Sequence, residues 1–527
     1  MRRPTRADCL LMLIMLLACV PALLPTALSL LRAVASPGAW SDIPSGPARW
    51  VLIARAGWVA ALIACLATLA GWPLAQLLRR CGGRLAAILL APVWMPAWLT
   101  YAGLNLARAP DTWIGGLVLD AALPDHRWAI VLLGRVVAIA SLVLWTAPIA
   151  ALVIAAFADP DADAAEELLH TEHVSFLRRT GIRFRLRRAS LSASLGAVFL
   201  LTFGSSVPLH LAQIETDAIV LWRAIAERTP DRWAGVWLAA WPQLIIAALG
   251  SAWFVRRAAA RPRPGESVAG GGRIVLSRWT RAIAVIVWIV AALLPTALML
   301  WSLDAWASIP RWFALNADAL GSSAQIAGVA GLLTGTAAVL IAAGHASERA
   351  VTRAVSLTVA GACVFSALVP GVLIGAAIAG MRLDDGVAAM LAAMARTLFI
   401  AGIAGVVAGG VEPPDVRAMR SMDARGDARG WVRVHGLRAS RLCAGVWIAS
   451  FLIGLHEIEA ATLVRPPGTG NLPQQMLSDL HYARLEQLSA GGVVIGLLGI
   501  TLGAVASGVL SLRVRQLDRL RAVPPQI

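Results

Sequence analysis

Long apolar runs alternate with short polar stretches along the whole chain. A helix needs about 20 apolar residues to cross the hydrocarbon core of a bilayer, and twelve stretches of this sequence are long enough. They are residues 9–33, 51–78, 85–107, 128–157, 189–209, 235–255, 280–303, 323–345, 354–380, 387–409, 441–461 and 490–512. The pattern therefore predicts an all-α, polytopic membrane protein with about twelve transmembrane helices.

Two longer polar stretches interrupt this pattern at matching places. Residues 159–188 and 412–441 are each followed by an apolar helix that contains a Phe-Leu pair, and the two pairs lie 252 positions apart. The pairs are Phe199-Leu200 and Phe451-Leu452. A chain in which a polar segment and the helix after it recur at one offset is expected to consist of two repeated halves, as in many transporters.

The same offset predicts the domain organisation. Residues 1–256 form the first six-helix half and residues 279–527 form the second. Between them, residues 257–278 carry an Arg-Pro-Arg-Pro-Gly stretch and three consecutive glycines, which is typical of a linker. The first apolar run continues to about Leu31, which favours an uncleaved first helix over a signal peptide.

Composition and charge support the membrane interpretation and orient the chain. Of the 527 residues, 58% are hydrophobic, and the net charge of +16 comes entirely from arginine because the chain has no lysine. The arginines lie in the short loops that follow every second predicted helix, so these loops and both termini are expected in the cytoplasm. No basic domain stands apart from the apolar runs, which argues against nucleic-acid binding.

Several motifs resemble those of one transporter family. Residues 451–473, from Phe451 through Glu457 to Pro466-Pro467-Gly468 and Pro473, resemble a signature of the permeases of ATP-binding-cassette (ABC) importers, specifically the fused iron(III)/thiamine type. The stretch 368–375, which includes Pro370-Gly371, resembles another motif of these permeases, and Pro92 and Pro96 occupy the corresponding first-half helix. Gly204 to Pro208 resembles the segment that follows the cytoplasmic loop of the first half.

This resemblance implies a role for the two polar stretches. In the family such segments form short coupling helices that dock on a separate ATPase. Ungapped alignment places Glu166, Glu167 and Glu172 at the first motif, and Ala418, Asp423 and Ala424 at the second. The motif is degenerate, since Glu172 replaces a glycine, Ala424 replaces another glycine, and the second copy lacks its glutamate. On composition alone both stretches are equally compatible with solvated amphipathic loops.

The resemblance also implies candidates for the transport pathway. They are Gly204, Pro208, Pro370, Gly371, Glu457, Pro466, Pro467 and Gly468. A carboxylate inside a membrane is costly and often functional, but Glu457 lies near a predicted helix end and is equally compatible with a residue that reaches the interface or caps a loop.

We therefore expect a bacterial inner-membrane permease subunit of an ABC importer for a small solute such as iron(III) or thiamine. The expected partners are the lipid bilayer, two copies of a separate ATPase and a periplasmic or extracellular solute-binding protein. No catalytic residues, metal site or cofactor are expected, and without a lysine the chain has no phosphate-binding P-loop. The alternative is an ion-coupled secondary transporter with two repeated halves; no set of residues indicates a membrane-embedded enzyme.

Overall fold

The computed structural model describes most of the chain, and every element in the described residues is a helix. The described residues are 6–41, 47–81, 83–109, 112–121, 127–158, 165, 175–205, 207–227, 233–260, 277–410, 419, 422, 428–455, 457–464 and 470–521. This result confirms the all-α class.

The first half of the chain contributes helices of very different lengths. Its long helices are α1 (Arg6–Ala35), α3 (Pro47–Cys81), α7 (Arg127–Ala156), α9 (Phe176–Phe203) and α13 (Trp241–Ala259). Its short ones are α2 (Pro37–Ser41), α4 (Gly83–Leu89), η1 (Ala91–Trp94), α5 (Ala97–Asn105), η2 (Leu106–Arg108), α6 (Trp113–Ala121), α10 (Val207–Leu211), α11 (Asp217–Glu227) and α12 (Trp233–Ala239).

The second half of the chain has a similar succession of helices. Its long helices are α14 (Arg278–Trp301), α15 (Ser308–His345), α16 (Ala350–Leu368), α18 (Asp385–Gly410), α20 (Ala428–Leu455) and α23 (Leu485–Arg521). Its short ones are α17 (Gly371–Ala379), α21 (Ala461–Val464) and α22 (Leu472–His481).

Within the described residues, nine helices are long and apolar enough to cross a membrane, and two bent pairs raise this number to eleven. One bent pair lies within α1, where the two parts meet at 70°, and the other is α12 with α13, at 55°. The chain is therefore a multi-spanning, membrane-embedded protein. The predicted span 85–107 is not one helix but the four short pieces α4, η1, α5 and η2, and the predicted span 354–380 is divided into α16 and α17.

Small residues allow the central helices of the second half to pack closely. Helix α15 lies between α18 and α20. A Cβ atom on Gly335 of α15 would lie only 2.7 Å from the Cys443 carbonyl oxygen of α20. A Cβ atom on Gly409 of α18 would lie 2.6 Å from the Ala342 carbonyl oxygen of α15. Such glycine contacts replace the hydrophobic effect as the source of helix association in lipid, because they allow close van der Waals packing.

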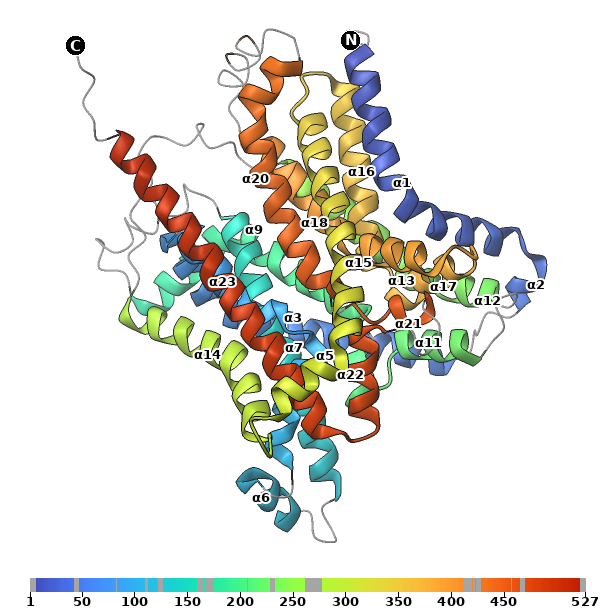
Figure 1. The fold of residues 1–527 in the computed structure, drawn as a ribbon, viewed down its shortest axis with the longest axis vertical. Coiled ribbons are helices and arrows are strands. Elements are labelled where there is room, and N and C mark those ends of the chain that lie inside the picture. The colour runs from blue at the N-terminus through green and yellow to red at the C-terminus, as the bar shows by residue number, and fades with distance from the viewer. Residues whose placement is uncertain are drawn as a thin grey trace.

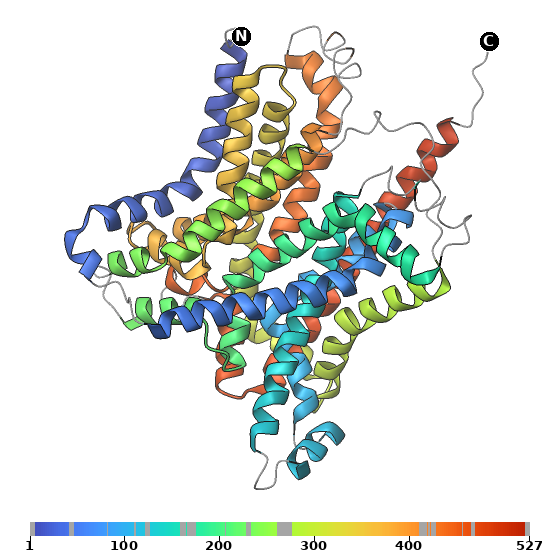
Figure 2. The same ribbon diagram turned by 180° about the vertical axis from the view of Figure 1, so that it is seen from behind.

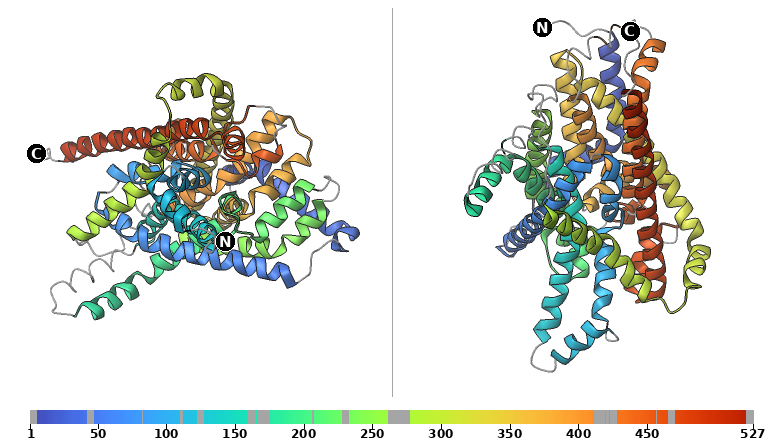
Figure 3. Two further views of the ribbon diagram at one scale, coloured as in Figure 1. Left: turned by 90° about the horizontal axis from the view of Figure 1, so that it is seen from below. Right: turned by 90° about the vertical axis from the view of Figure 1, so that its left-hand side faces the viewer.

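The first helix of each predicted half packs against the other half. Helix α1 contacts α15, α16, α17 and α18, whereas α14 contacts α3, α5 and α7. The last helices do the same, since α13 packs on α16 and α18 and α23 packs on α4 and η1. In Figure 3, α23 runs along one side of the molecule and its C-terminal part extends beyond the other helices. The two parts of the chain are thus interlocked rather than simply side by side.

Several segments that were predicted to share one side of the membrane lie at one end of the structure. The N-terminal end of α1 and the beginning of α20 lie at the end opposite α6 (Figures 1 and 2). An ion pair between Asp8 of α1 and Arg349, which precedes α16, holds the first of these ends to the α15–α16 connection.

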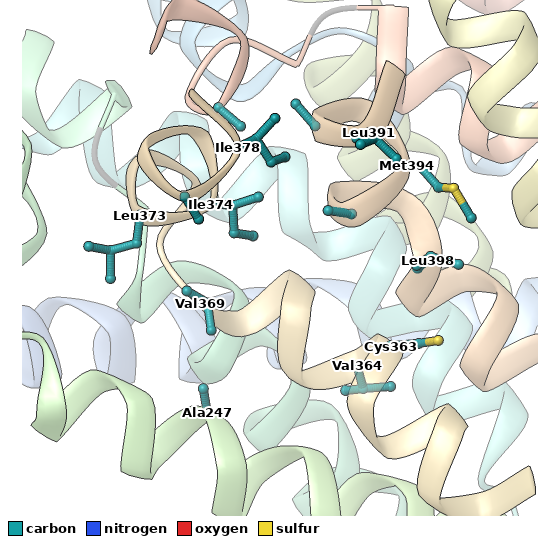
Figure 4. Close-up of a cluster of buried hydrophobic side chains, with 14 of the residues drawn as sticks. Ala247, Cys363, Val364, Val369, Leu373, Ile374, Ile378, Leu391, Met394 and Leu398 are labelled. Carbon is teal, nitrogen blue, oxygen red and sulfur yellow. The ribbon is translucent and has the colours of Figure 1, made fainter. Parts of the chain in front are cut away.

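The largest apolar core surrounds the connection between α16 and α17. Figure 4 shows Val369 at this connection, with Ile374 and Ile378 of α17 on the side of Leu391 and Met394 of α18. All five side chains are buried. This core fixes the position of the broken helix on which the candidate site is built.

Candidate functional site

Two helical segments are interrupted at a proline in corresponding places. Val369 is extended, and Pro370 is the residue that precedes the first turn of α17. Met95 is extended in the same way, and Pro96 precedes α5. Proline has no N–H group and disfavours helical backbone in the residue before it. Each interruption therefore leaves backbone carbonyl groups of the preceding helix without their usual intrahelical partners.

Arg396 of α18 satisfies two carbonyl groups at the second interruption. Its Nη1 donates hydrogen bonds to the carbonyl oxygens of Ala367 and Val369, at 3.0 Å each. The guanidinium group can do this because it presents several donors in a fixed planar arrangement. Arg396 thus replaces the helical hydrogen bonds that Pro370 prevents.

The same guanidinium group faces two carboxylates. Its Nε lies 3.5 Å from Glu457 Oε1 and its Nη2 lies 3.5 Å from Glu459 Oε2. Glu457 also accepts hydrogen bonds from the backbone N–H groups of Ala460 and Ala461, and so caps the beginning of α21. We call Arg396, Glu457 and Glu459 the charged cluster. With both carboxylates ionised it carries one net negative charge, in a largely buried place.

The segment that bears the two glutamates packs directly on α17. A Cβ atom on Gly371 would lie 2.6 Å from Glu459 Cβ, and one on Gly375 would lie 2.6 Å from the Ala460 carbonyl oxygen. Real Cβ atoms essentially never approach other atoms this closely. Glycine is therefore required at both positions for this contact, one turn apart on a single helix face.

The charged cluster adjoins residues of the first half. A Cβ atom on Gly204, at the end of α9, would lie 3.5 Å from the Leu368 carbonyl oxygen, beside Pro370. Ile458 of the second half belongs to the same buried apolar cluster as Met95 and Val207 of the first half. The second interruption thus lies against the segment that follows α9, and the first shares a buried cluster with the segment that follows α20.

The space next to Glu457 is very small in this conformation. A cavity of about 20 Å³ is lined by Glu457, Ser323, Gly454 and Asn471. This volume is sufficient for about one water molecule. This cavity is therefore too small for a larger solute.

A second buried ion pair lies in the first half, at the bend between α12 and α13. Arg49 Nε lies 3.2 Å from Asp217 Oδ1, and Gln243 Nε2 donates to Asp217 Oδ2 at 3.1 Å. Arg49 also donates to the Ala239 carbonyl, just before the bend. Burial raises the pKa of Asp217, while the hydrogen bond and charge of Arg49 act in the opposite direction. As at the charged cluster, an arginine joins carbonyl groups of an interrupted helix to a carboxylate.

The structure brings together four of the predicted pathway residues. Gly204, Pro370, Gly371 and Glu457 meet around the charged cluster. Pro208 is buried in α10, which packs on α5 and α7. Glu457 caps the first turn of α21, and its ion pair with Arg396 adds an interaction that the sequence did not predict.

The remaining predicted residues lie outside the described part of the chain. These are Glu166, Glu167, Glu172, Ala418, Asp423, Ala424, Pro466, Pro467 and Gly468. Of the second polar stretch, Met419 and Met422 are described as helical, and both side chains are largely exposed.

Sequence reasoning missed Arg396, Glu459, Arg49 and Asp217. Arg396 could have been found, because it is the only charged residue between positions 386 and 410 of a predicted membrane helix. Asp217 lies outside the predicted spans, and its burial against Arg49 has no local sequence signal. Among the described residues, no group of three His, Cys, Asp or Glu side chains is placed to hold a metal ion.

Comparison with known proteins identifies no relative. No family model matches the chain, and no curated protein and no solved structure gives a significant match.

Proposed function

We propose that this chain is the permease subunit of an ATP-driven ABC importer. Two copies of a separate ATPase would bind residues 159–188 and 412–441. A solute-binding protein would deliver a small solute, such as iron(III) or thiamine, to the other side of the membrane. The membrane would be the inner membrane of a bacterium, with both termini in the cytoplasm.

The observation that supports this proposal best is the contact between two motifs that are distant in the sequence. Residues 368–375 and 451–473 each resemble a motif of ABC importer permeases. In the structure, Gly371 and Gly375 of the first motif contact Glu459 and Ala460 of the second. A chance resemblance would not be expected to place motif glycines at the contact between the two stretches.

The order of the helices supports the proposal of two equivalent halves. Helix α3 packs on α7 and α9, and α15 packs on α18 and α20. The interruptions before Pro96 and Pro370 follow α3 and α15 respectively. Two bundles that each contain a broken helix and a central interface can alternate access by rotating as rigid bodies.

The path from an ATPase to the charged cluster would be short. Helix α20 begins at Ala428, within the second polar stretch, and a single residue separates its last residue, Leu455, from Glu457. A displacement of α20 along its axis would therefore displace Glu457 and Glu459 relative to Arg396 on α18. ATP binding would in this way open the interruption at Pro370, and hydrolysis would allow it to close again.

Co-purification with the ATPase tests the proposal directly. The variant in which Glu166, Glu167 and Asp423 are all replaced by Asn or Gln should lose the ATPase that the unmodified chain retains from a bacterial membrane extract. A matched control replaces Asp304, Asp384 and Asp385, which lie in loops predicted on the opposite side, and should retain the ATPase. Failure of the unmodified chain to bring down any ATPase would overturn the proposal.

A second candidate function is supported by the charged cluster itself. Two largely buried carboxylates beside a single arginine are typical of sites that bind protons or cations in ion-coupled transporters. Proteoliposomes that contain only this chain distinguish the candidates. Solute uptake driven by a proton or sodium gradient alone would favour the secondary transporter, whereas uptake that requires the ATPase and ATP would favour the importer.

A further inference from the structure

A groove lies on the outside of the helix bundle between α3, α9 and α13. Its volume is about 380 Å³, and it is lined by apolar residues with Ser192 as the one hydroxyl-bearing side chain. The walls include Ala61 and Cys65 of α3, Leu195 and Phe199 of α9, and Trp253 of α13. Its volume is in the range of pockets that bind small ligands.

The groove faces the hydrocarbon region of the bilayer. Helices α3 and α9 are each long and apolar enough to span a membrane. Helix α13 meets this criterion together with α12, as one bent pair. Nearby large apolar side chains on two of these helices are exposed, among them Leu69 at 59% and Leu249 at 67%. An apolar groove on such a surface is available to an acyl chain rather than to water.

Three arginines lie at one end of this groove. The contacts of Gly196 with Trp253 and of Gly250 with Leu200 show that α9 and α13 run antiparallel. Arg188 precedes Ser192 by one helical turn, and Arg256 and Arg257 follow Trp253 by one turn. Because the two helices are antiparallel, all three arginines lie beyond the same end of the groove. This end is the one predicted to face the cytoplasm.

We propose that the groove binds one anionic phospholipid. An acyl chain lies along the groove between α3, α9 and α13, and the phosphate group interacts with Arg188, Arg256 and Arg257. The apolar walls account for the acyl chain, and the three positive charges account for a preference for an anionic headgroup. This inference is independent of the transported solute and of the energy source.

Native mass spectrometry of the full-length chain in detergent tests the proposal. The protein is titrated with phosphatidylglycerol and, separately, with phosphatidylcholine of the same acyl chains. We expect one phosphatidylglycerol molecule to bind at least about tenfold more tightly than phosphatidylcholine, since arginines near an anionic headgroup attract it strongly. Equal affinities for the two lipids would overturn the proposal.

Two triple variants distinguish lipid binding at the groove from a general attraction of anionic lipid to a positively charged protein. Replacing Arg188, Arg256 and Arg257 with Gln should abolish the preference for phosphatidylglycerol. The matched control replaces Arg278, Arg281 and Arg353 on α14 and α16, which removes the same charge without changing α3, α9 or α13, and should preserve it. A loss of the preference in both triple variants would overturn the assignment to this groove.

A variant with a larger side chain in the groove tests whether the acyl chain lies there. Cys65→Phe places a ring in the groove from an exposed position, so the fold should tolerate it; an unchanged elution volume and circular dichroism spectrum check this. Binding of the tight phosphatidylglycerol molecule should fall at least about tenfold. If Cys65→Phe does not fold, Ser192→Leu provides the same test near the polar end. Unchanged binding in a folded filling variant would show that the lipid lies elsewhere.

Discussion

Arg396 Nε lies 3.5 Å from Glu457 Oε1, and this pair connects the middle of α18 to the segment that follows α20. The same arginine donates to the carbonyl oxygens of Ala367 and Val369 at the end of α16. One side chain thus joins three elements that are distant in the sequence. Any movement of α20 relative to α16 must change this set of interactions.

Replacing Arg396 should therefore be strongly destabilising. Arg396→Met leaves two carbonyl groups without a donor and two carboxylates without a counter-charge, and breaking a buried pair in this way costs about 3–5 kcal/mol. We expect a large fall in the unfolding temperature of the detergent-solubilised chain and loss of transport. Arg353→Met, on the less buried surface of α16, is the control and should change little. An unchanged unfolding temperature for Arg396→Met would contradict the role given to the charged cluster.

The two glycines of α17 should be sensitive to a single added methyl group. In Gly375→Ala the new Cβ meets the backbone carbonyl of Ala460, which cannot rotate away as a side chain can. We expect a loss of about 1–3 kcal/mol in the free energy of unfolding, as for other overpacked sites.

Gly361 of α16 provides the matched control for this prediction. A Cβ atom there would meet nothing within 4 Å, so Gly361→Ala should be neutral or stabilise by up to about 1 kcal/mol through helix propensity. Denaturant or thermal unfolding of the two variants in parallel measures the difference. Equal stabilities would show that α17 and residues 457–464 are not packed as described.

The burial of the Arg49–Asp217 pair predicts how the stability of a double variant should compare with that of a single variant. Arg49→Met leaves Asp217 charged and buried, and should destabilise by about 3–5 kcal/mol. Adding Asp217→Leu removes the unpaired charge, so the double variant should recover a large part of this loss. A double variant that is less stable than Arg49→Met would show that the two residues do not form a coupled pair.

The fold class could be predicted from the sequence because lipid imposes a simple requirement. Every long apolar run must become a helix in order to satisfy its backbone hydrogen bonds, and most of the predicted spans are helices here. The interruptions were harder to predict. Pro96 and Pro370 break their spans, whereas Pro73, Pro148 and Pro295 are retained inside continuous helices. At Pro370 the break is stabilised by a tertiary partner, because Arg396 donates to the carbonyl oxygens of Ala367 and Val369.

The candidate site could be predicted only in part for a related reason. Motif resemblance identified Pro370, Gly371 and Glu457, because these residues lie in recognisable local patterns. It did not identify Arg396 or Glu459, whose roles depend on which distant carbonyl or guanidinium group they meet. The two breaks at which an arginine joins a carboxylate to backbone carbonyl oxygens are visible only in three dimensions.

Native cysteines provide a test of the packing of α1 against the second half. The sulfur atoms of Cys19 in α1 and Cys363 in α16 lie 3.9 Å apart, and both residues are buried. A small movement would bring them to bonding distance. We expect a membrane-permeant oxidant to form an intramolecular disulfide, detected by mass spectrometry of the digested protein. The Cys363→Ser variant is the control and should form no disulfide with Cys19. If Cys19 stays reduced in the oxidised native chain, α1 does not pack against α16 as described.

The last prediction concerns the orientation of the chain in the membrane. Arg178 in the first turn of α9 and Arg429 in the first turn of α20 both lie in arginine-rich stretches. Because arginine-rich loops tend to remain in the cytoplasm during insertion, we expect both residues on that side. Arg178→Cys and Arg429→Cys, made in a background without native cysteines, should both be protected from an impermeant thiol reagent in intact cells and labelled in inverted vesicles. Asp304→Cys, in the loop between α14 and α15, should show the opposite pattern. If the two cysteines are labelled from opposite faces of the membrane, no ATPase can bind both segments. A soluble ATPase on one side cannot reach two segments that the bilayer separates.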